Sequence, residues 1–272
     1  MTININVTYL SWIPLGRVLF ERFLSSYLEQ KAGIDHRLVI AFTGYEKEEQ
    51  LLEYRTILAD ISHDEICIPN PGFDIGFYRT VAQHMPEQIH LFLNTYSFFM
   101  AKNWLRKLYD VYIQPGTGAI SASGSYGCSV FLQKHHFPDN NPLYKKPIRF
   151  LRYLWYRRLF DPFPCLHLRS TAFMIGHDLF LDLETPVFKT KIDTTLFEHG
   201  KNSMTNQIIR RGFKALVVDK NGKSYEPANW AQSNTFWIGN QDNLLIADNR
   251  TEQYRTANQQ MKAYLTKLAW GI

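Results

Sequence analysis

The amino-acid sequence predicts an α/β fold, with a mostly parallel central sheet and helices on both of its faces. Short β-branched, apolar segments alternate along the chain with longer segments whose apolar residues recur at the helical period. The chain has 272 residues, of which 45% are hydrophobic and 15% aromatic, so it can bury a large core. Strands that alternate with helices form parallel sheets, because each connection crosses back over one face of the sheet.

The N-terminal half repeats a unit in which a strand is followed by a helix. In the first helix, apolar side chains from Leu19 to Leu28 share one face, and in the second, Leu51, Leu52 and Leu58 are expected to face inward. The predicted strands are 3–10, 37–42, 65–68, 89–94 and 118–122. The predicted helices are 15–28, 48–61, 77–85 and 102–112.

The amino-acid composition of the sequence changes after Gly127. Residues 135–144, rich in Pro and Asn, are expected to form a surface excursion, and a basic aromatic helix is predicted over 147–160. Its apolar side is expected to face inward and its Arg and Tyr side outward, although Arg158 interrupts that pattern. The side expected inward holds Ile148, Phe150, Leu151, Leu154, Trp155 and Leu159, and the opposite side holds Arg149, Arg152, Tyr153, Tyr156 and Arg157.

A second α/β stretch follows, with strands at 172–175 and 215–218 and a helix over 203–211. The chain is predicted to end in a single helix. Its inward side chains are expected to be Tyr254, Ala257, Met261, Tyr264, Leu265 and Leu268.

The net charge of +5 is concentrated in one segment. Residues 134–160 hold seven Lys or Arg and one Asp, and the remainder of the chain sums to −1. This distribution argues against a nucleic-acid-binding protein and for one local basic surface facing an anion. Membrane contact through the helix at 147–160 is one alternative that this pattern leaves open, and a core helix with a basic edge is the other.

Cysteine usage and the N-terminus both indicate a cytoplasmic protein. Cys67, Cys128 and Cys165 are odd in number and widely spaced, which is typical of free thiols. The first residues lack the basic and apolar regions of a signal peptide, and no apolar run is long enough to span a bilayer. His135 and His136 have no third ligand at metal spacing, so a loop role is favoured for them.

Candidate site residues follow from the geometry of an open parallel sheet, in which ligands bind beyond the carboxyl ends of the strands. The motifs GxGxxG, GxxxxGK[ST] and GxSxG are absent, which disfavours a dinucleotide site, a P-loop and a serine hydrolase. The residues that follow the predicted strands remain as donor-site candidates. They are Ser11, Trp12, Asp74, Asn94, Thr95, Tyr96, Gly124 and Ser125.

Four segments, in their order along the chain, resemble GT-A glycosyltransferases of the family-2 type. They are Gly72-Phe73-Asp74-Ile75-Gly76, the strand end Phe92-Leu93-Asn94-Thr95-Tyr96-Ser97, the small-residue strand 118–125, and Phe197-Glu198-His199-Gly200 followed by 203–218. Arg169-Ser170-Thr171 resembles the segment that introduces the acceptor side. The resemblance spans residues 3–220 and implies a Rossmann-like GT-A fold that binds a nucleotide sugar.

The resemblance also implies roles for individual residues. Glu198 corresponds to the catalytic base, and His199 is the alternative base because imidazole titrates near neutrality. Arg169, and Arg152 from the basic helix, are candidates for binding phosphate, with a surface ion pair as the alternative for Arg169. Asp74 either contacts the nucleotide or caps a helix.

The sequence departs from the family pattern in two places. Glu198 is followed by His199 rather than Asp, and its spacing to Gly212 is longer than in the family, which weakens the assignment of Glu198 as the base. The other departure is at the end of the strand 89–94. Asn94-Thr95-Tyr96 stands where the family carries an acidic metal-binding motif, and hard cations require charged oxygen ligands. We therefore expect no required metal, with weak Mg²⁺ or Mn²⁺ dependence left open. Helix N-termini and Arg or Lys side chains, with the segment 145–158 nearest in sequence, are expected to hold the diphosphate instead.

These observations predict a single GT-A domain with a nucleotide-sugar half, residues 1–127, and an acceptor half, residues 128–272. The predicted activity is sugar transfer from a nucleotide diphosphate sugar to a hydroxyl of a surface-glycan or lipid-linked saccharide, with inversion. The predicted location is cytoplasmic, with peripheral contact at the inner membrane face left open. A catalytically silent nucleotide-sugar or glycan-binding protein and a membrane-surface adaptor are the alternatives.

Overall fold

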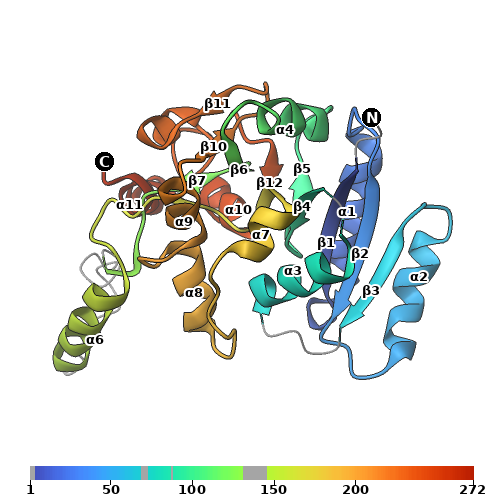
Figure 1. Ribbon diagram of the computed structural model, residues 1–272, viewed down its shortest axis with the longest axis horizontal. Helices are drawn as coiled ribbons and strands as arrows, with labels where there is room; N and C mark the ends of the chain where they lie inside the picture. The colour runs from blue at the N-terminus through green and yellow to red at the C-terminus, as the bar shows by residue number, and fades with distance from the viewer. Residues whose placement is uncertain (1–3, 69–72, 87, 131–145) are drawn as a thin grey trace.

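The computed structural model describes residues 4–68, 73–86, 88–130 and 146–272 (Figure 1). Its main sheet contains β1 (Ile5–Trp12), β2 (Arg37–Thr43), β3 (Asp64–Ile68), β4 (Ile89–Leu93), β6 (Thr117–Ser121), β9 (Ala172–Gly176), β10 (Lys214–Val218) and β11 (Ser224–Tyr225). Two small sheets pair β5 (Phe98–Phe99) with β12 (Ile246–Ala247), and β7 (Gly124–Ser125) with β8 (His167–Leu168).

The α-helices are α1 (Arg17–Glu29), α2 (Leu52–Leu58), α3 (Phe73–His84), α4 (Trp104–Tyr112), α6 (Lys146–Leu159), α7 (His177–Asp182), α8 (Lys191–His199), α9 (Met204–Arg210), α10 (Asn249–Thr256) and α11 (Gln259–Trp270). Short 3₁₀ turns lie at Ile13–Leu15, Glu48–Leu51 and Pro227–Ser233. No helix among the described residues is long and apolar enough to cross a bilayer.

The main sheet is mostly parallel, as predicted, with the strand order β11-β10-β6-β9-β4-β1-β2-β3. β1 pairs in parallel with β2 and β4, and β10 pairs in parallel with β6. β9 runs antiparallel between β4 and β6, which the sequence pattern did not indicate. Strands from both predicted halves therefore belong to one sheet, and the division at residue 127 stays a functional prediction.

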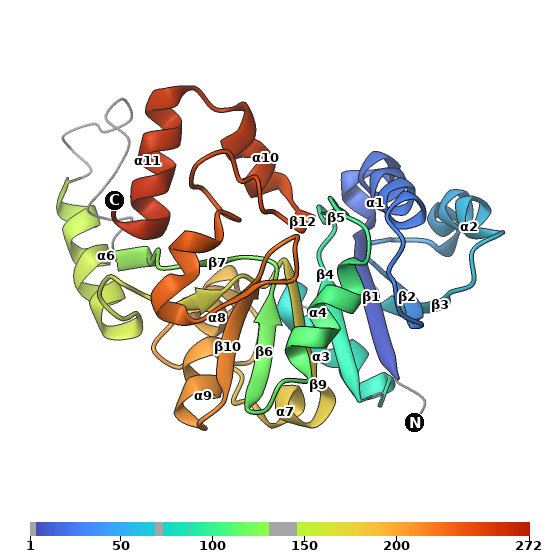
Figure 2. The ribbon, with the colours of Figure 1, turned by 90° about the horizontal axis from the view of Figure 1, so that it is seen from above.

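Helices cover both faces of the sheet, which confirms the predicted layers. Phe23 of α1, Leu58 of α2 and Trp104 of α4 belong to the core on one face. Phe77 of α3 and Phe180 of α7 belong to the core on the other face, together with side chains of α8 and α9. Figure 2 shows α10 and α11 on the side of the sheet where the parallel strands end.

Two expectations about helix faces and boundaries are wrong. The final helix is two helices, because the side chain of Asn258 accepts a hydrogen bond from the backbone N–H of Met261 and starts α11 as a new helix. Leu28 and Leu52, expected inward, are 49% and 57% exposed. Leu28 lies at the edge of the apolar stripe of its helix, and Leu52 lies about 100° around the helix from the buried Leu51.

The face assigned to the basic aromatic helix is also wrong, although the helix itself is present as α6. Tyr153, Tyr156 and Leu159, at helical spacing, pack against a small core that contains Phe160. The side chains of Phe150, Leu151, Leu154 and Trp155, expected inward, are instead exposed. The expected excursion at 135–144, with His135 and His136, lies outside the described residues, as do the side chains of Ile148 and Arg149.

Candidate active site

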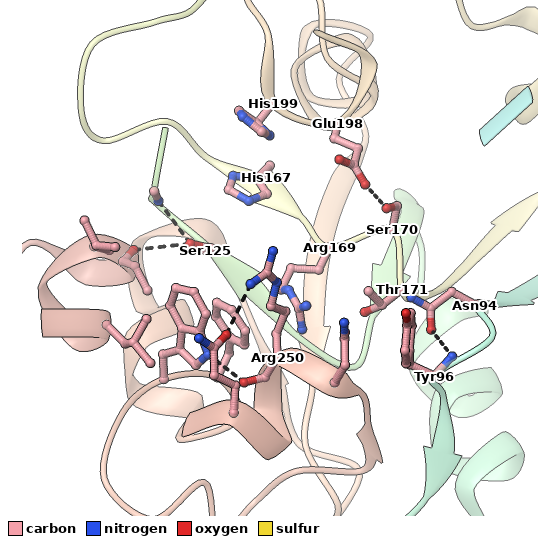
Figure 3. A pocket seen from close by; sticks show the side chains of 18 of the residues that line it. Asn94, Tyr96, Ser125, His167, Arg169, Ser170, Thr171, Glu198, His199 and Arg250 are labelled. Carbon is pink, nitrogen blue, oxygen red and sulfur yellow. Dashed lines mark hydrogen bonds between the residues drawn. The ribbon is translucent and has the colours of Figure 1, made fainter. Parts of the chain in front are cut away.

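A cavity of about 550 Å³ opens at the carboxyl edge of the sheet, between the turn after β4 and helices α8, α10 and α11 (Figure 3). Seven of the residues predicted from sequence line it, namely Asp74, Asn94, Tyr96, Ser125, Arg169, Glu198 and His199. Ser170 and Thr171, which also line the cavity, belong to one of the segments that resemble the family. No motif in the sequence marks the other lining residues with polar side chains as site residues. These are His167, Asn249, Arg250, Gln253, Trp237 and Cys128.

The turn after β4 is held by its own side chains. The amide oxygen of Asn94 accepts hydrogen bonds from the Tyr96 backbone N–H at 3.1 Å and from the Ser97 hydroxyl at 2.9 Å. The Thr95 hydroxyl oxygen accepts from the Trp12 backbone N–H at 3.2 Å. These bonds orient Tyr96 toward the cavity and leave Thr95 outside its lining.

Glu198 lies near the end of α8 and faces the hydroxyl of Ser170, which donates a short hydrogen bond to its carboxylate. Burial raises the pKa of Glu198 above its ordinary value; the Ser170 hydrogen bond opposes this rise and the nearby Asp74 carboxylate adds to it. A carboxylate with a raised pKa, at the wall of a cavity, is suited to accepting a proton from a bound hydroxyl.

His199 is placed differently from Glu198. Its Nε2 lies 3.0 Å from the Ser129 hydroxyl, and its ring lies 5.1 Å from that of His167. Burial, with the His167 charge as a second cause, lowers the pKa of His199 to about 3. An imidazole of such low basicity accepts protons poorly near neutral pH.

Arg169 forms a buried ion pair rather than a surface one. Its guanidinium lies 2.7 Å from the Asp248 carboxylate, with side-chain exposures of 9% and 3%. It also donates to the Ser123 hydroxyl at 3.2 Å and lies 4.0 Å from the centre of the Phe236 ring. Although burial alone would raise the pKa of Asp248, the charge of Arg169 and hydrogen bonds from Thr251 and Thr171 lower it below its ordinary value.

Arg250 brings a second guanidinium to the cavity, from the first turn of α10. The Arg250 side chain is exposed and donates a hydrogen bond to the Gln253 amide oxygen at 3.2 Å. Among the described residues, no carboxylate forms an ion pair with it. Its backbone carbonyl accepts a hydrogen bond from the Trp237 indole at 2.9 Å, which fixes the start of the helix. Arg250 is therefore a cation at the cavity wall with room for an anionic ligand.

Five other predicted site residues lie outside the cavity lining. Ser11 is buried, whereas Trp12 is 46% exposed at the end of β1. A side chain at Gly124 would approach the Trp230 ring to 2.9 Å, so glycine is required there for packing. Thr95 points into the turn after β4, and Arg152 is exposed on α6. Their predicted roles stay predictions.

Asp74 lies in the first turn of α3, as the second residue of the helix. In that position a carboxylate interacts favourably with the helix dipole, and it also faces the cavity. Asp74 is therefore not the N-cap expected as one alternative, because an N-cap residue precedes the helix, whereas its contact with a nucleotide stays a prediction.

Comparison with solved structures finds proteins whose fold is similar to that of this chain. A mannosyltransferase from Pyrobaculum calidifontis, solved in complex with GDP-Man and Mn²⁺, superposes with a TM-score of 0.51 at 14% identity, over 82% of this chain and 56% of that one. Mouse xyloside xylosyltransferase 1 gives 0.45 at 12% identity, over 80% and 86% of the chains. A putative glucose-1-phosphate thymidylyltransferase from Bacillus anthracis gives 0.47 at 9%, over 93% and 96%.

No protein-family model and no curated protein sequence matches the chain. The chain spans 56% of the length of the mannosyltransferase that it matches, so the likeness concerns the fold. The fold is GT-A-like, as predicted, with a mostly parallel central sheet and helices on both faces.

Proposed function

We propose that the protein is a glycosyltransferase that moves a sugar from a nucleotide diphosphate sugar to a hydroxyl of a surface-glycan or lipid-linked saccharide. The observation that carries the proposal is the position of the Glu198 carboxylate in the wall of the cavity at the carboxyl edge of a GT-A sheet. Open α/β sheets bind ligands at that edge. A cytoplasmic location belongs to the same proposal.

The proposed reaction is a single displacement. Glu198 accepts the proton of the acceptor hydroxyl while the hydroxyl oxygen forms a bond to the anomeric carbon of the donor sugar. The bond from that carbon to the diphosphate oxygen breaks, and the nucleoside diphosphate leaves with the bonding electrons. Attack from the face opposite the leaving group inverts the anomeric centre, so the product and the donor have opposite anomeric configurations.

The side chains in the turn after β4 do not fit a tightly held divalent cation. Asn94, Thr95 and Tyr96 supply no carboxylate, and the Asn94 oxygen already accepts two hydrogen bonds. Within the described residues, no group of three His, Cys, Asp or Glu could hold a metal. The proposed displacement therefore involves no metal held by these side chains, and a weak dependence on Mg²⁺ or Mn²⁺ would come from ions that bind the donor itself.

Arg250 takes the role of diphosphate ligand in this proposal. A guanidinium binds phosphate oxygens through two parallel hydrogen bonds, and Arg250 has no competing carboxylate in the described chain. Arg250→Ala is expected to weaken donor binding about tenfold to a hundredfold, because a charge-assisted hydrogen bond contributes about 1.5–3 kcal/mol. Calorimetric titration with the donor measures this effect.

The control for Arg250 comes from the same helix. Arg255 pairs with Glu252 and does not line this cavity, so Arg255→Ala should leave donor affinity unchanged. Arg250→Lys, which retains the charge and loses the planar fork, should fall between the two. Equal donor affinity for the native protein and Arg250→Ala would remove Arg250 from this role.

The proposed function is tested by a screen for thermal stabilisation by UDP-, GDP-, dTDP- and CMP-sugars, each with Mg²⁺, with Mn²⁺ and with chelator. A donor that binds the native state raises the unfolding temperature, and the expected rise persists in chelator. Transfer and donor hydrolysis are then measured with the donor found. Transfer that collapses in chelator and returns with metal would overturn the metal assignment, and binding without any turnover would identify a silent binding protein.

A further inference from the structure

One face of α6 exposes four large apolar side chains within six consecutive residues. Phe150 is 60% exposed, Leu151 66%, Leu154 42% and Trp155 48%. The opposite side of the helix is occupied, because Tyr153, Tyr156 and Leu159 pack against the small core around Phe160. Single exposed apolar side chains are ordinary on protein surfaces, whereas a contiguous group marks an interaction surface.

Arginines surround and interrupt this apolar face. At 3.6 residues per turn, the four exposed apolar side chains span an arc of roughly 140°. Arg158 falls near the middle of the arc, Arg157 lies about 20° beyond one border, and Arg152 lies about 60° beyond the other; all three are exposed. Lys146–Leu159 contains no acidic residue. The face is therefore both apolar and strongly basic.

We propose that the exposed face of α6 binds the surface of an anionic lipid bilayer. Helices that lie in the membrane interface combine Trp, Phe and Leu on one face with Arg at its borders, where the guanidinium groups reach lipid phosphates. A protein partner would have to bury Arg158 at the centre of the patch and supply a carboxylate for it. A bilayer leaves the Arg158 guanidinium among the headgroups, because a long side chain extends toward the polar layer.

The helix is joined to the part of the protein that carries the catalytic base. The backbone N–H of Lys201 donates to the carbonyl of Leu159 at 3.0 Å, and the rings of Phe160 and His199 lie 5.3 Å apart. Leu196 of α8 packs into the same small core as α6. A bilayer bound by α6 would therefore be close to the end of α8, where Glu198 lies. This inference goes beyond the proposed glycosyl transfer and does not require it.

Sedimentation with lipid vesicles tests the proposal in the absence of any donor. The full-length protein is mixed with vesicles of phosphatidylcholine alone and of phosphatidylcholine with phosphatidylglycerol. Binding to the anionic vesicles, little binding to the neutral ones, and loss of binding at high salt are expected. Absence of binding to anionic vesicles at low salt would overturn the proposal.

Matched variants separate α6 from the rest of the surface. The double variant Leu154→Ser with Trp155→Ser should lower the vesicle partition coefficient about tenfold or more, because two apolar side chains no longer enter the interface. The control Val18→Ser with Val187→Ser removes two side chains that are 72% and 73% exposed elsewhere, and it should bind like the native protein. Arg158→Glu should weaken binding more than Lys102→Glu, which makes the same charge change at an exposed position outside α6.

Thermal unfolding confirms that each variant is folded, which is expected because all the changed side chains are exposed. Equal partition of the α6 variant and its control would overturn the proposal. A dimer of the native protein that dissociates in the α6 variant, without vesicle binding, would also overturn it and would assign the face to a second copy of the chain.

Discussion

Glu198→Gln is expected to lower the turnover number for sugar transfer by about 10²- to 10⁴-fold while leaving donor affinity nearly unchanged. Glutamine retains an oxygen that can accept the Ser170 hydrogen bond, so the cavity wall should keep its shape. It cannot accept a proton from the acceptor. Steady-state transfer together with titration of the donor measures the two effects separately.

The control is Glu226→Gln, the same substitution at an exposed carboxylate outside the cavity, which should retain native turnover. In the native protein, turnover should fall on the acidic side with an apparent pKa above that of an ordinary glutamate, since burial raises the pKa of Glu198. Turnover by Glu198→Gln comparable to that of the native protein would exclude Glu198 as the base.

Glu198→Gln should not lower the free energy of unfolding at pH 7. A carboxyl whose pKa is raised in the folded state contributes stability below its unfolded pKa and loses that contribution as the pH rises through its folded pKa. Ionised Glu198 therefore costs folding free energy at pH 7, and the glutamine variant should unfold at an equal or higher temperature there. This relative advantage should shrink as the pH is lowered toward 4.

Asp248→Asn is expected to reduce the free energy of unfolding by about 3 kcal/mol or more, since it leaves the buried Arg169 guanidinium without its counter-charge. Asparagine is also a good N-cap residue, so the start of α10, which the Asp248 side chain caps, should form in the variant. The decrease in the free energy of unfolding therefore measures the loss of the ion pair and not the loss of the helix cap. Chemical denaturation of the two proteins measures it.

An exposed ion pair provides the comparison. Arg17 and Glu53 lie 3.3 Å apart, with side-chain exposures of 56% and 69%, and Glu53→Gln should change the free energy of unfolding by less than about 1 kcal/mol. A loss below 1 kcal/mol for Asp248→Asn would show that water or another group compensates Arg169.

The fold could be predicted from the sequence where the hydrophobic pattern of a single strand or helix was clear by itself. β1, β4 and β10 are apolar runs buried on both faces, and helices such as α4 carry a clear apolar stripe, so periodicity identified them. The orientation of α6 could not be identified in the same way. Its two sides are both rich in large side chains, and the position of the small core around Phe160 decides which side is buried.

The candidate site was predictable only in part. Asn94, Tyr96 and Glu198 follow or end regular elements and match positions in a known motif order, so their proximity to the cavity could be anticipated. Arg250 belongs to a segment with no motif, and it reaches the cavity because β12 pairs with β5, far away in sequence. Its contribution depends on tertiary structure, which residue spacing does not reveal.

The antiparallel strand β9 limits how this protein can be recombined with others of the same fold. β9 comes from the C-terminal half of the chain, yet it pairs with β4 on the side opposite β1, and it pairs with β6 on its other side. A fragment ending near residue 127 would expose the backbone edges of β4 and β6 to solvent. Chimeras with another protein of this fold should therefore exchange loops and leave residues 172–176 with the host.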